Sequence, residues 1–497
     1  MVISPVHYIA VPLLAAFTMP LIAKVSKEFA RVIPGLVMMY LSFVSIVLMQ
    51  QVMQTGPISE VIAGWQAPWG INLMFTPFSG FLASLMSFMG LLIWLYSFNF
   101  KKVDFSQSLK YQTLQMMMVT GAIGIVLTGD IFNLFVFLEI TAITAYSLTA
   151  FYRERDGAEA AFKYLLIGSF ASVFVLLAIM LLYTQLGTLN MAEIAQKIQA
   201  GELSGTMKTT IFALFLIGFG IEAEMFPLNG WAPDAYSQAP GPIGAAFASI
   251  VVKAGVYALI RVTFTLFDIQ GAHMYLIIAG LVTMVIAEIS AVAQTNLKRM
   301  LAYSSIGQMG FVLIAFGIGT REAVFGAIFL MFNHAIIKGL LFMTGSYLTF
   351  NDTKKQISSL RGLGKKLPLV SLLFAIGAFA IVGLPPFSGF WSKLYVLTAA
   401  GSKEMLMLIL IILGVSVVEI IYYFRVVGKL YFSKEENDVE VQKPSINAMI
   451  PMVILGLVIV AVGIYPDLVT GFFERAADML LDKAQYIETV LTQNVVN

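Results

Sequence analysis

The stretch FGIEAEMFPLNGWAPDAYSQAP, residues 219–240, places acids and helix-breaking residues at the end of the apolar run TIFALFLIGFGI. The acids are Glu222 and Glu224, and the prolines are Pro227, Pro233 and Pro240. A charged side chain at the centre of a bilayer costs about 2.5–3.5 kcal/mol even on lenient scales. Pro227 cannot donate a hydrogen bond to the preceding helical turn. The stretch therefore predicts a membrane helix that breaks where its acids lie.

The composition of the whole chain is that of a polytopic membrane protein. Of its 497 residues 59% are hydrophobic and 12% are charged, about half the charged fraction of a soluble domain. The apolar residues fall in blocks of about 18–25, the length that a helix needs to cross a bilayer. The net charge of +2 is carried by loops, so no nucleic-acid-binding face is expected. The chain has no cysteine, which excludes disulfides and thiolate metal sites on it.

We predict an all-α fold with about fourteen membrane spans. They cover roughly 7–23, 32–52, 75–98, 111–129, 131–151, 162–184, 209–227, 243–266, 274–294, 301–318, 323–348, 368–399, 404–430 and 447–472. The seventh and twelfth are broken, at Pro227 and at Pro385 and Pro386. Four regions follow from this division. They are helices one to three in 1–110, four to eight in 111–266, nine to thirteen in 267–430, and the last span with its tail in 431–497.

Basic residues gather in alternate loops, and this sets the orientation. The loops are 24–31, 101–110, 153–163, 298–299 and 354–366, with Lys101, Lys102 and Lys354 among their members. Since basic loops face the cytoplasm, we expect a multi-pass protein of the plasma membrane with both termini on the outer side. The first apolar stretch lacks a basic leader and is expected to be a retained span. The tail ERAADMLLDKAQYIETVLTQ predicts an amphipathic helix on the outer surface.

Nine of the ionisable residues inside the predicted spans are candidates for function, because a charge there needs a reason. They are Glu139, Glu222, Glu224, Lys253, Glu288, His334, Lys338, Lys393 and Glu419. The plainer alternative for each is a structural hydrogen bond to a neighbouring helix. We favour an ion-pathway role for Glu139, Glu222, Lys253, His334, Lys338 and Lys393, and leave Glu224, Glu288 and Glu419 evenly balanced.

The spacing of these residues favours a pathway over a binding pocket. His334 and Lys338 are four residues apart and share a helix face, and imidazole titrates near neutral pH. The acids and bases are distributed over successive helices, whereas a substrate pocket would concentrate them. The segment KYLLIGS after Phe162 resembles KGLLFMTGS after Ile337, and a proline-broken span follows each. Paired broken helices are typical of transporters built from repeats. Lys163, near the cytoplasmic end of its span, is equally suited to anchor the helix at the membrane interface and to take part in a proton relay.

Several blocks carry a family resemblance over residues 110–430. The stretch FPLNGWAPDAYSQAPGPIGAAFASIVVKAGVYALIRV resembles the signature of the antiporter-like subunits. These subunits occur in respiratory complex I, in Mrp-type sodium/proton antiporters and in membrane-bound hydrogenases. RMLAYSSIGQMGF, NHAIIKGLLFMTGS and GLPPFSGFWSK resemble further family blocks in the same order. The resemblance implies fourteen helices with two inverted five-helix repeats and breaks in helices seven and twelve.

The resemblance also implies residue roles and a function. It makes Glu139 the helix-five glutamate, Lys253 the helix-eight lysine, and His334 with Lys338 the helix-eleven block, while Lys393 takes the helix-twelve position. It implies an ion-translocating subunit, moving protons or exchanging sodium for protons. Its expected partners are the lipid bilayer and other membrane subunits of a hydrogenase-like or Mrp-like complex. No nucleic acid and no cofactor on this chain are expected.

Two positions depart from the family pattern. Glu222 stands where most relatives have lysine, and Gln308 stands where some have histidine. Glu139 would then face Glu222, and two carboxylates in one dry site hold a proton or a cation between them. The first half of the protein either still conducts protons through Glu222 and Lys253, or favours sodium near Glu139 and Glu222. No other metal site is expected.

Two alternatives stay open at this point. A stand-alone secondary transporter of a small organic substrate predicts a concentrated pocket. A scaffold subunit that lost pumping through Glu222 predicts that replacing Lys253 or Lys393 changes nothing. The chain has no nucleotide motif, haem-ligand pair or soluble domain, so any redox chemistry would belong to partner subunits.

Overall fold

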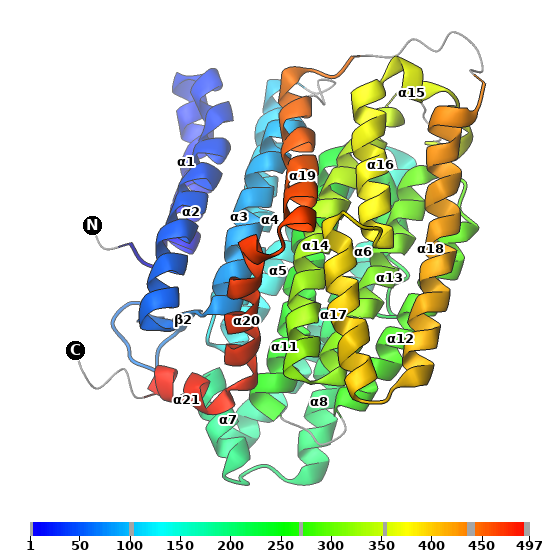
Figure 1. Cartoon of the computed structure of the whole chain (residues 1–497). Helices are drawn as coiled ribbons and strands as arrows, with labels where there is room; N and C mark the ends of the chain where they lie inside the picture. The colour runs from blue at the N-terminus through cyan, green and yellow to red at the C-terminus, as the bar shows by residue number, and fades with distance from the viewer. Residues whose placement is uncertain (1–2, 99–103, 268–271, 351–354, 435–442, 492–497) are drawn as a thin grey trace.

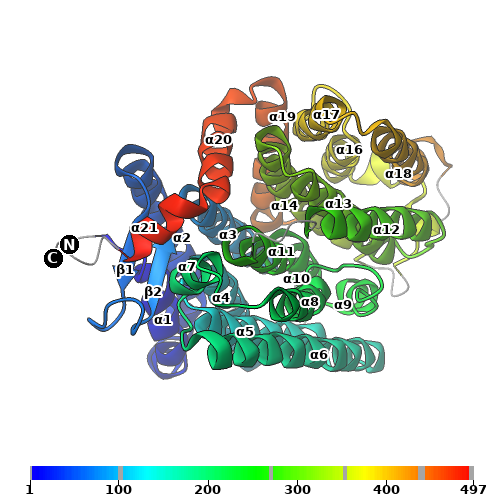
Figure 2. The same ribbon diagram turned by 90° about the horizontal axis from the view of Figure 1, so that it is seen from below.

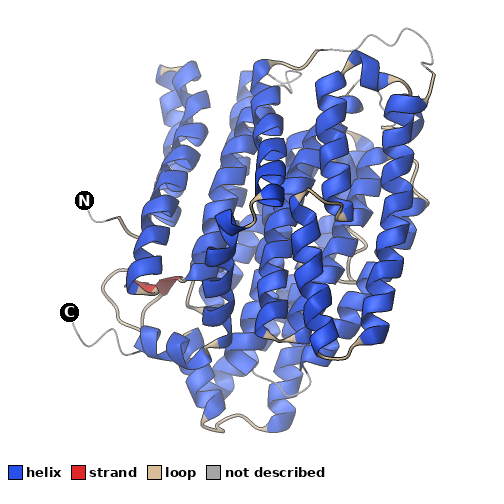
Figure 3. Cartoon of the chain, viewed as in Figure 1, coloured by secondary structure: helices blue, strands red, loops and turns tan. Residues whose placement is uncertain are grey.

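The structure is a computed structural model, and it describes residues 3–98, 104–267, 272–350, 355–434 and 443–491. Lys101, Lys102 and Lys354, which contribute to the predicted orientation, lie outside these residues. The fold is a bundle of helices with one short hairpin (Figures 1 and 3). The hairpin pairs β1 (Ile58–Val61) antiparallel with β2 (Asn72–Phe75).

The helices up to the first break are α1 (His7–Val25), α2 (Lys27–Thr55), α3 (Pro77–Ser97), α4 (Phe105–Leu127), α5 (Ile131–Thr149), α6 (Arg155–Leu186), α7 (Met191–Gln199) and α8 (Gly205–Glu222). The helices between the breaks are α9 (Ala232–Gln238), α10 (Gly241–Ala246), η1 (Phe247–Val251), α11 (Val252–Arg261), η2 (Val262–Phe267), α12 (Ala272–Val292), α13 (Leu297–Ile318), α14 (Arg321–Leu348), η3 (Ile357–Leu360), α15 (Leu363–Lys366) and α16 (Pro368–Val382). The last helices are α17 (Ser388–Ser402), α18 (Leu406–Phe432), α19 (Ile446–Ile464), α20 (Asp467–Leu481) and α21 (Lys483–Leu491).

Twelve of the described helices, with α10 to η2 taken as one, are long and apolar enough to span a membrane. The predicted spans 111–129 and 368–399 are not among them. The first corresponds to α4, whose first half is polar, and the second to α16 and α17, which have 15 residues each. The chain thus forms an all-α polytopic fold. The count of fourteen membrane spans and the division into four regions remain predictions.

The centre of the bundle is built from the column α10 to η2 and from α13 and α14. In the most apolar 18-residue stretch of the column every residue is buried, and in the corresponding stretches of α13 and α14 94% of the residues are buried. Viewed from below, these helices lie between α5 and α6 on one side and α16, α17 and α18 on the other (Figure 2). The outer helices present apolar side chains outward, as a lipid environment allows. Polar groups in the central helices are therefore shielded from lipid on both sides.

Both predicted breaks are present, and the first lies at the acids, as the sequence predicts. The apolar run to Pro227 is not all helix, because α8 ends at Glu222. Glu224 has φ of +59°, in the left-handed region, where a right-handed helix cannot continue. The second break separates α16 from α17 around Pro385 and Pro386.

The C-terminal tail is helical as predicted, but it does not simply lie on the surface. The Phe473 ring of α20 lies 5.0 Å from that of Phe81 on α3 and 5.2 Å from that of Phe329 on α14, measured between centroids. The tail is thus partly seated in the bundle. The shorter α21 contacts α7 and β1, and the Ser4 hydroxyl donates to Glu60 of β1. Ser4 and α21 therefore both lie next to β1, on the same side of the bundle (Figure 1).

We expect Phe473→Ala to release α20 from the bundle, because a large buried ring is lost at a cost of about 3–5 kcal/mol. Phe473 is 1% exposed, whereas its neighbour Phe472 is 39% exposed. Limited proteolysis of the C-terminal helices should therefore accelerate in Phe473→Ala and stay unchanged in Phe472→Ala. Equal protection of the two variants would contradict this seating of α20.

Candidate functional site

The first break keeps its backbone groups hydrogen-bonded although the helix has ended. The Phe226 N–H donates to the Thr283 hydroxyl of α12 at 3.0 Å, and the Trp231 indole N–H donates to the Ile221 carbonyl at 3.3 Å. The Trp231 ring stacks on Tyr164 of α6 with centroids 3.7 Å apart. Because unsatisfied backbone groups are costly in a membrane, these contacts make an irregular segment tolerable there.

Three acids surround this break. Glu222 and Glu224 are both buried, and Glu139 of α5 is half-buried and accepts a hydrogen bond from the Ser172 hydroxyl of α6. Glu139 lies within electrostatic range of Glu222, and Tyr146 lies within range of both acids. The predicted neighbourhood of Glu139 and Glu222 is thus present, although no hydrogen bond joins their carboxylates among the described contacts.

Glu224 faces away from this pair toward α9. Its carboxylate accepts a hydrogen bond of 2.5 Å from the Tyr236 hydroxyl, and its second oxygen has no hydrogen-bond partner among the described residues. Glu224 is also within electrostatic range of Lys253 and Lys338. It therefore lies between the acidic break and the buried bases.

Lys253 and His334 form the next link. The Lys253 ammonium contacts the Nδ1 atom of His334 and donates to the Ala248 carbonyl, while the Nε2 atom of His334 lies 3.1 Å from the Ser305 hydroxyl. Ala248 belongs to η1, a π-helical turn. Such turns open the regular hydrogen-bond ladder and recur at functional sites, and this one directs a carbonyl to the lysine.

Lys338 continues the series one turn along α14. Its ammonium donates to the Tyr423 hydroxyl at 3.0 Å and to the Leu301 carbonyl at 3.2 Å. The Tyr423 hydroxyl in turn lies 3.0 Å from the Ser304 hydroxyl. Among the described residues no carboxylate lies at hydrogen-bond distance from Lys338, and dipoles from α13 and α18 hold its ammonium instead.

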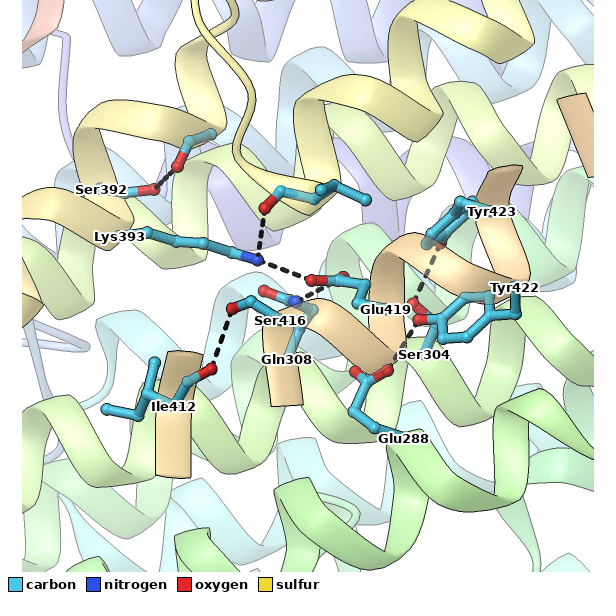
Figure 4. Close-up of polar contacts among 12 residues, drawn as sticks. Glu288, Ser304, Gln308, Ser392, Lys393, Ile412, Ser416, Glu419, Tyr422 and Tyr423 are labelled. Carbon is cyan, nitrogen blue, oxygen red and sulfur yellow. Dashed lines mark hydrogen bonds and ion pairs between the residues drawn. The ribbon is translucent and has the colours of Figure 1, made fainter. Parts of the chain in front are cut away.

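The last links lie between α12, α13, α17 and α18 (Figure 4). The Lys393 ammonium pairs with the Glu419 carboxylate at 2.6 Å and donates to the Val382 carbonyl, freed by the second break, at 3.0 Å. The Gln308 amide donates to the other Glu419 oxygen at 2.8 Å. Tyr422 donates to Glu288 at 2.7 Å. Glu288 and Glu419 are both buried inside the bundle.

Electrostatic contacts join these links into one series across the molecule. Lys338 lies within range of Glu224 on one side and of Glu288, Glu419 and Lys393 on the other. We call this set the polar series. Its members are Glu139, Glu222, Glu224, Lys253, His334, Lys338, Glu288, Lys393 and Glu419.

The structure brings together the six favoured residues, but Lys163 does not join them. Lys163 is partly exposed and pairs with Glu159 and Asp234 near the end of α6. The structure adds uncharged members that the sequence analysis missed. They are Tyr236, Ser304, Ser305, Tyr422 and Tyr423. A signal for the last two was present, because they lie three and four residues after Glu419 and so share its helix face.

A cavity of about 330 Å³ lies at the end of the bundle that carries most of the predicted basic loops. Its lining includes Arg31, Ser108, Tyr111, Gln112 and Pro242. The Tyr111 hydroxyl and the Gln112 amide oxygen are buried without a partner among the described residues. Buried polar groups in a cavity of this size are the surroundings in which ordered water is found.

No group of three or more His, Cys, Asp and Glu side chains converges as a metal site among the described residues. A sodium ion near Glu222 would therefore need further oxygen ligands, such as hydroxyl groups, backbone carbonyls or water.

The sequence matches the family described as "NADH:quinone oxidoreductase/Mrp antiporter, TM" over residues 128–421. The chain belongs to this family. The family match spans both breaks and every member of the polar series. The resemblance to antiporter-like subunits is thus confirmed.

Individual relatives match over nearly the whole chain. The chain is 31% identical to a Na(+)/H(+) antiporter subunit of Alkalihalophilus pseudofirmus, over 98% of each chain. It is 30% identical to an NADH-quinone oxidoreductase subunit of Desulforudis audaxviator, over 93% of this chain and 96% of that one. A solved chain of the archaeal "membrane-bound sulfane sulfur reductase (MBS)" is 38% identical, with a TM-score of 0.91 over 98% of this chain and 100% of that one.

We expect Gly255→Ala to destabilise the first break. A Cβ atom at Gly255 would lie 2.6 Å from the carbonyl of Glu222, so α11 and the end of α8 would have to separate. Overpacking of this kind costs about 1–3 kcal/mol. The thermal unfolding midpoint should fall in Gly255→Ala but not in the control Gly414→Ala, where no atom lies within 4 Å. Equal midpoints would contradict the close packing at the break.

Proposed function

We propose that the chain is the ion-translocating subunit of a multisubunit membrane complex, and that it moves protons along the polar series. The observation that carries this proposal is the continuity of ionisable groups, all but the half-buried Glu139 buried, from Glu139 to Glu419. The names of its relatives, which describe antiporter and oxidoreductase subunits, support it. Four cavities lined by described residues contain no member of the series, which argues against a stand-alone transporter of an organic substrate.

The chemistry of the links fits proton transfer. Lysine, histidine, tyrosine, serine and glutamate all exchange protons or orient a water that does. His334 lies between Lys253 and Ser305 and has a ring nitrogen toward each. A proton accepted at one nitrogen can therefore be released from the other. Ordered water is expected to bridge the remaining gaps.

The Lys393–Glu419 pair supplies a way to drive the transfer. In a low-dielectric interior the interaction between charges is strong and little screened. When the pair is closed, the Glu419 charge is largely compensated. When it opens, Glu419 attracts a proton on Lys338, with which it is in electrostatic range. Opening and closing this pair would thus shift protons along the series.

We further propose the plasma membrane as the location, with both termini on the outer side. The alternation of basic loops supports this orientation. The cavity near Gln112 would then open to the cytoplasm and hydrate the path toward Lys253. Other membrane subunits are the expected partners, and they would cover the flank of α5 where Glu139 is half-buried.

The role of Glu222 is tested by ion uptake into vesicles that hold the parent complex. Native protein is compared with Glu222→Gln and Glu222→Lys, under a defined proton gradient, with and without sodium. If the acid serves protons, Glu222→Gln slows proton transport about 100-fold, a typical loss for a proton-transfer group, and sodium has no effect. If sodium binds there, Glu222→Gln abolishes only the sodium-dependent part, and Glu222→Lys leaves proton movement alone. Native rates in both variants would make Glu222 structural.

The cytoplasmic access route is tested by cysteine labelling, which the absence of native cysteine makes clean. We expect Gln112→Cys to react with a membrane-impermeant maleimide added from the cytoplasmic side only. Gln115→Cys, one turn deeper and also buried, should react more slowly. Thr113→Cys is the control, because Thr113 is not among the residues that line the cavity. Protection of Gln112→Cys from the cytoplasmic side, or labelling from the outer side, would contradict the route.

A further inference from the structure

The short helix α9 is held in place by charges from its neighbours. It has seven residues, and a helix of that length is not stable in isolation. Asp234 in its first turn accepts a hydrogen bond of 2.9 Å from the Lys163 ammonium of α6. The same carboxylate pairs with the Arg299 guanidinium of α13. One acid thus joins a helix that precedes the first break to a helix that follows it.

The other end of α9 is held by two further lysines. The Lys355 ammonium donates to the Ser237 carbonyl at 2.8 Å, and the Lys298 ammonium donates to the Ala239 carbonyl at 3.3 Å. Cations at the carbonyl end of a helix are favourable, as are acids in its first turn. Four basic groups therefore fix the position of one short helix.

The inner side of α9 contacts the polar series. Tyr236 is fully buried, and its hydroxyl supplies the 2.5 Å hydrogen bond to Glu224. Its ring packs on Phe342 of α14 and Phe247 of η1, with centroids 5.3 and 5.5 Å apart. A shift of α9 would therefore move the donor of Glu224, whose second carboxylate oxygen has no partner among the described residues.

We propose that Asp234 is a positioning residue, which ties α6 to α13 and, through α9, holds Tyr236 against Glu224. The consequence for transport rests on the function proposed above, whereas the fixing of α9 does not. Glu224 is in electrostatic range of Glu222 and of Lys253 and Lys338. Its hydrogen bonding therefore sets the electrostatic coupling between the two halves of the series. Lys163 and Arg299 affect ion transfer through the Asp234 carboxylate, although they do not belong to the polar series.

The ion pairs at Asp234 fix a position rather than stabilise the fold. The side chains of Lys163 and Arg299 are 45% and 36% exposed, and that of Asp234 is 20% exposed. Partly exposed pairs contribute little to the free energy of unfolding, because solvent screens them. The thermal unfolding midpoint should accordingly change little in Asp234→Asn, and the effect must be sought in the mobility of α9 and in transport.

The first test measures the mobility of α9 without reference to transport. A nitroxide is attached at Gln238→Cys, which is unique because the chain has no cysteine. We expect a spectrum of low mobility in the otherwise native chain and in Asp234→Glu, and greater mobility in Asp234→Asn. The control Asp156→Asn removes an exposed acid of α6 that takes part in no described ion pair, and it should leave the spectrum unchanged. Equal mobility in all variants would overturn the proposal.

The second test asks whether Asp234 acts through Tyr236. We expect Asp234→Asn to slow ion uptake by the reconstituted complex about fivefold, the lower range of coupling between sites, and Asp234→Glu to restore it. In the Tyr236→Phe background, which lacks the hydrogen bond to Glu224, Asp234→Asn should cause no further loss. The same loss in both backgrounds would overturn the link to Glu224. If α9 loosens in Asp234→Asn while the native complex moves no ions, the proposed function fails and the fixing of α9 stands.

Discussion

The whole interior depends on one constraint, which is that a charge buried in a membrane must be matched by opposite charge or by oriented dipoles. The bundle meets this constraint differently along the polar series. Lys393 has a carboxylate partner, Glu419. Lys338 has only a tyrosine hydroxyl and a carbonyl as direct partners among the described residues. The second half therefore holds a directly paired charge, whereas Lys338 in the middle is held by dipoles alone, so that a mobile proton would change the charge balance there.

The two helix breaks serve this constraint, because each releases polar groups where charges are buried. The second break leaves the Val382 carbonyl free to accept from Lys393. The first ends α8 at Glu222, and α9 then brings Tyr236 to Glu224. The π-helical turn η1 acts in the same way for Lys253. Departures from regular helix thus coincide with members of the series, which is where a membrane protein tolerates them.

The amino-acid sequence predicted the parts of this arrangement that are local in the chain. The cost of charge in apolar spans identified Lys253 and its companions, and the prolines located both breaks. The pairing of Lys393 with Glu419 could not be predicted, because it depends on the relative rotation of two helices. The exact residue at which α8 ends depends on the left-handed backbone at Glu224, and glutamate is a residue type that gives no signal for that conformation. The seating of α20 likewise depends on a pocket formed by distant helices.

We propose that ions cross this protein by way of Lys338, whose charge has no directly paired carboxylate among the described residues. The most direct measurement is proton uptake by vesicles that hold the parent complex, comparing Lys338→Met with Lys197→Met, whose lysine pairs with Glu193 outside the predicted spans. Both complexes must first be shown to assemble to native amounts. We expect Lys338→Met to abolish uptake and Lys197→Met to transport at the native rate. Native uptake in Lys338→Met would contradict it.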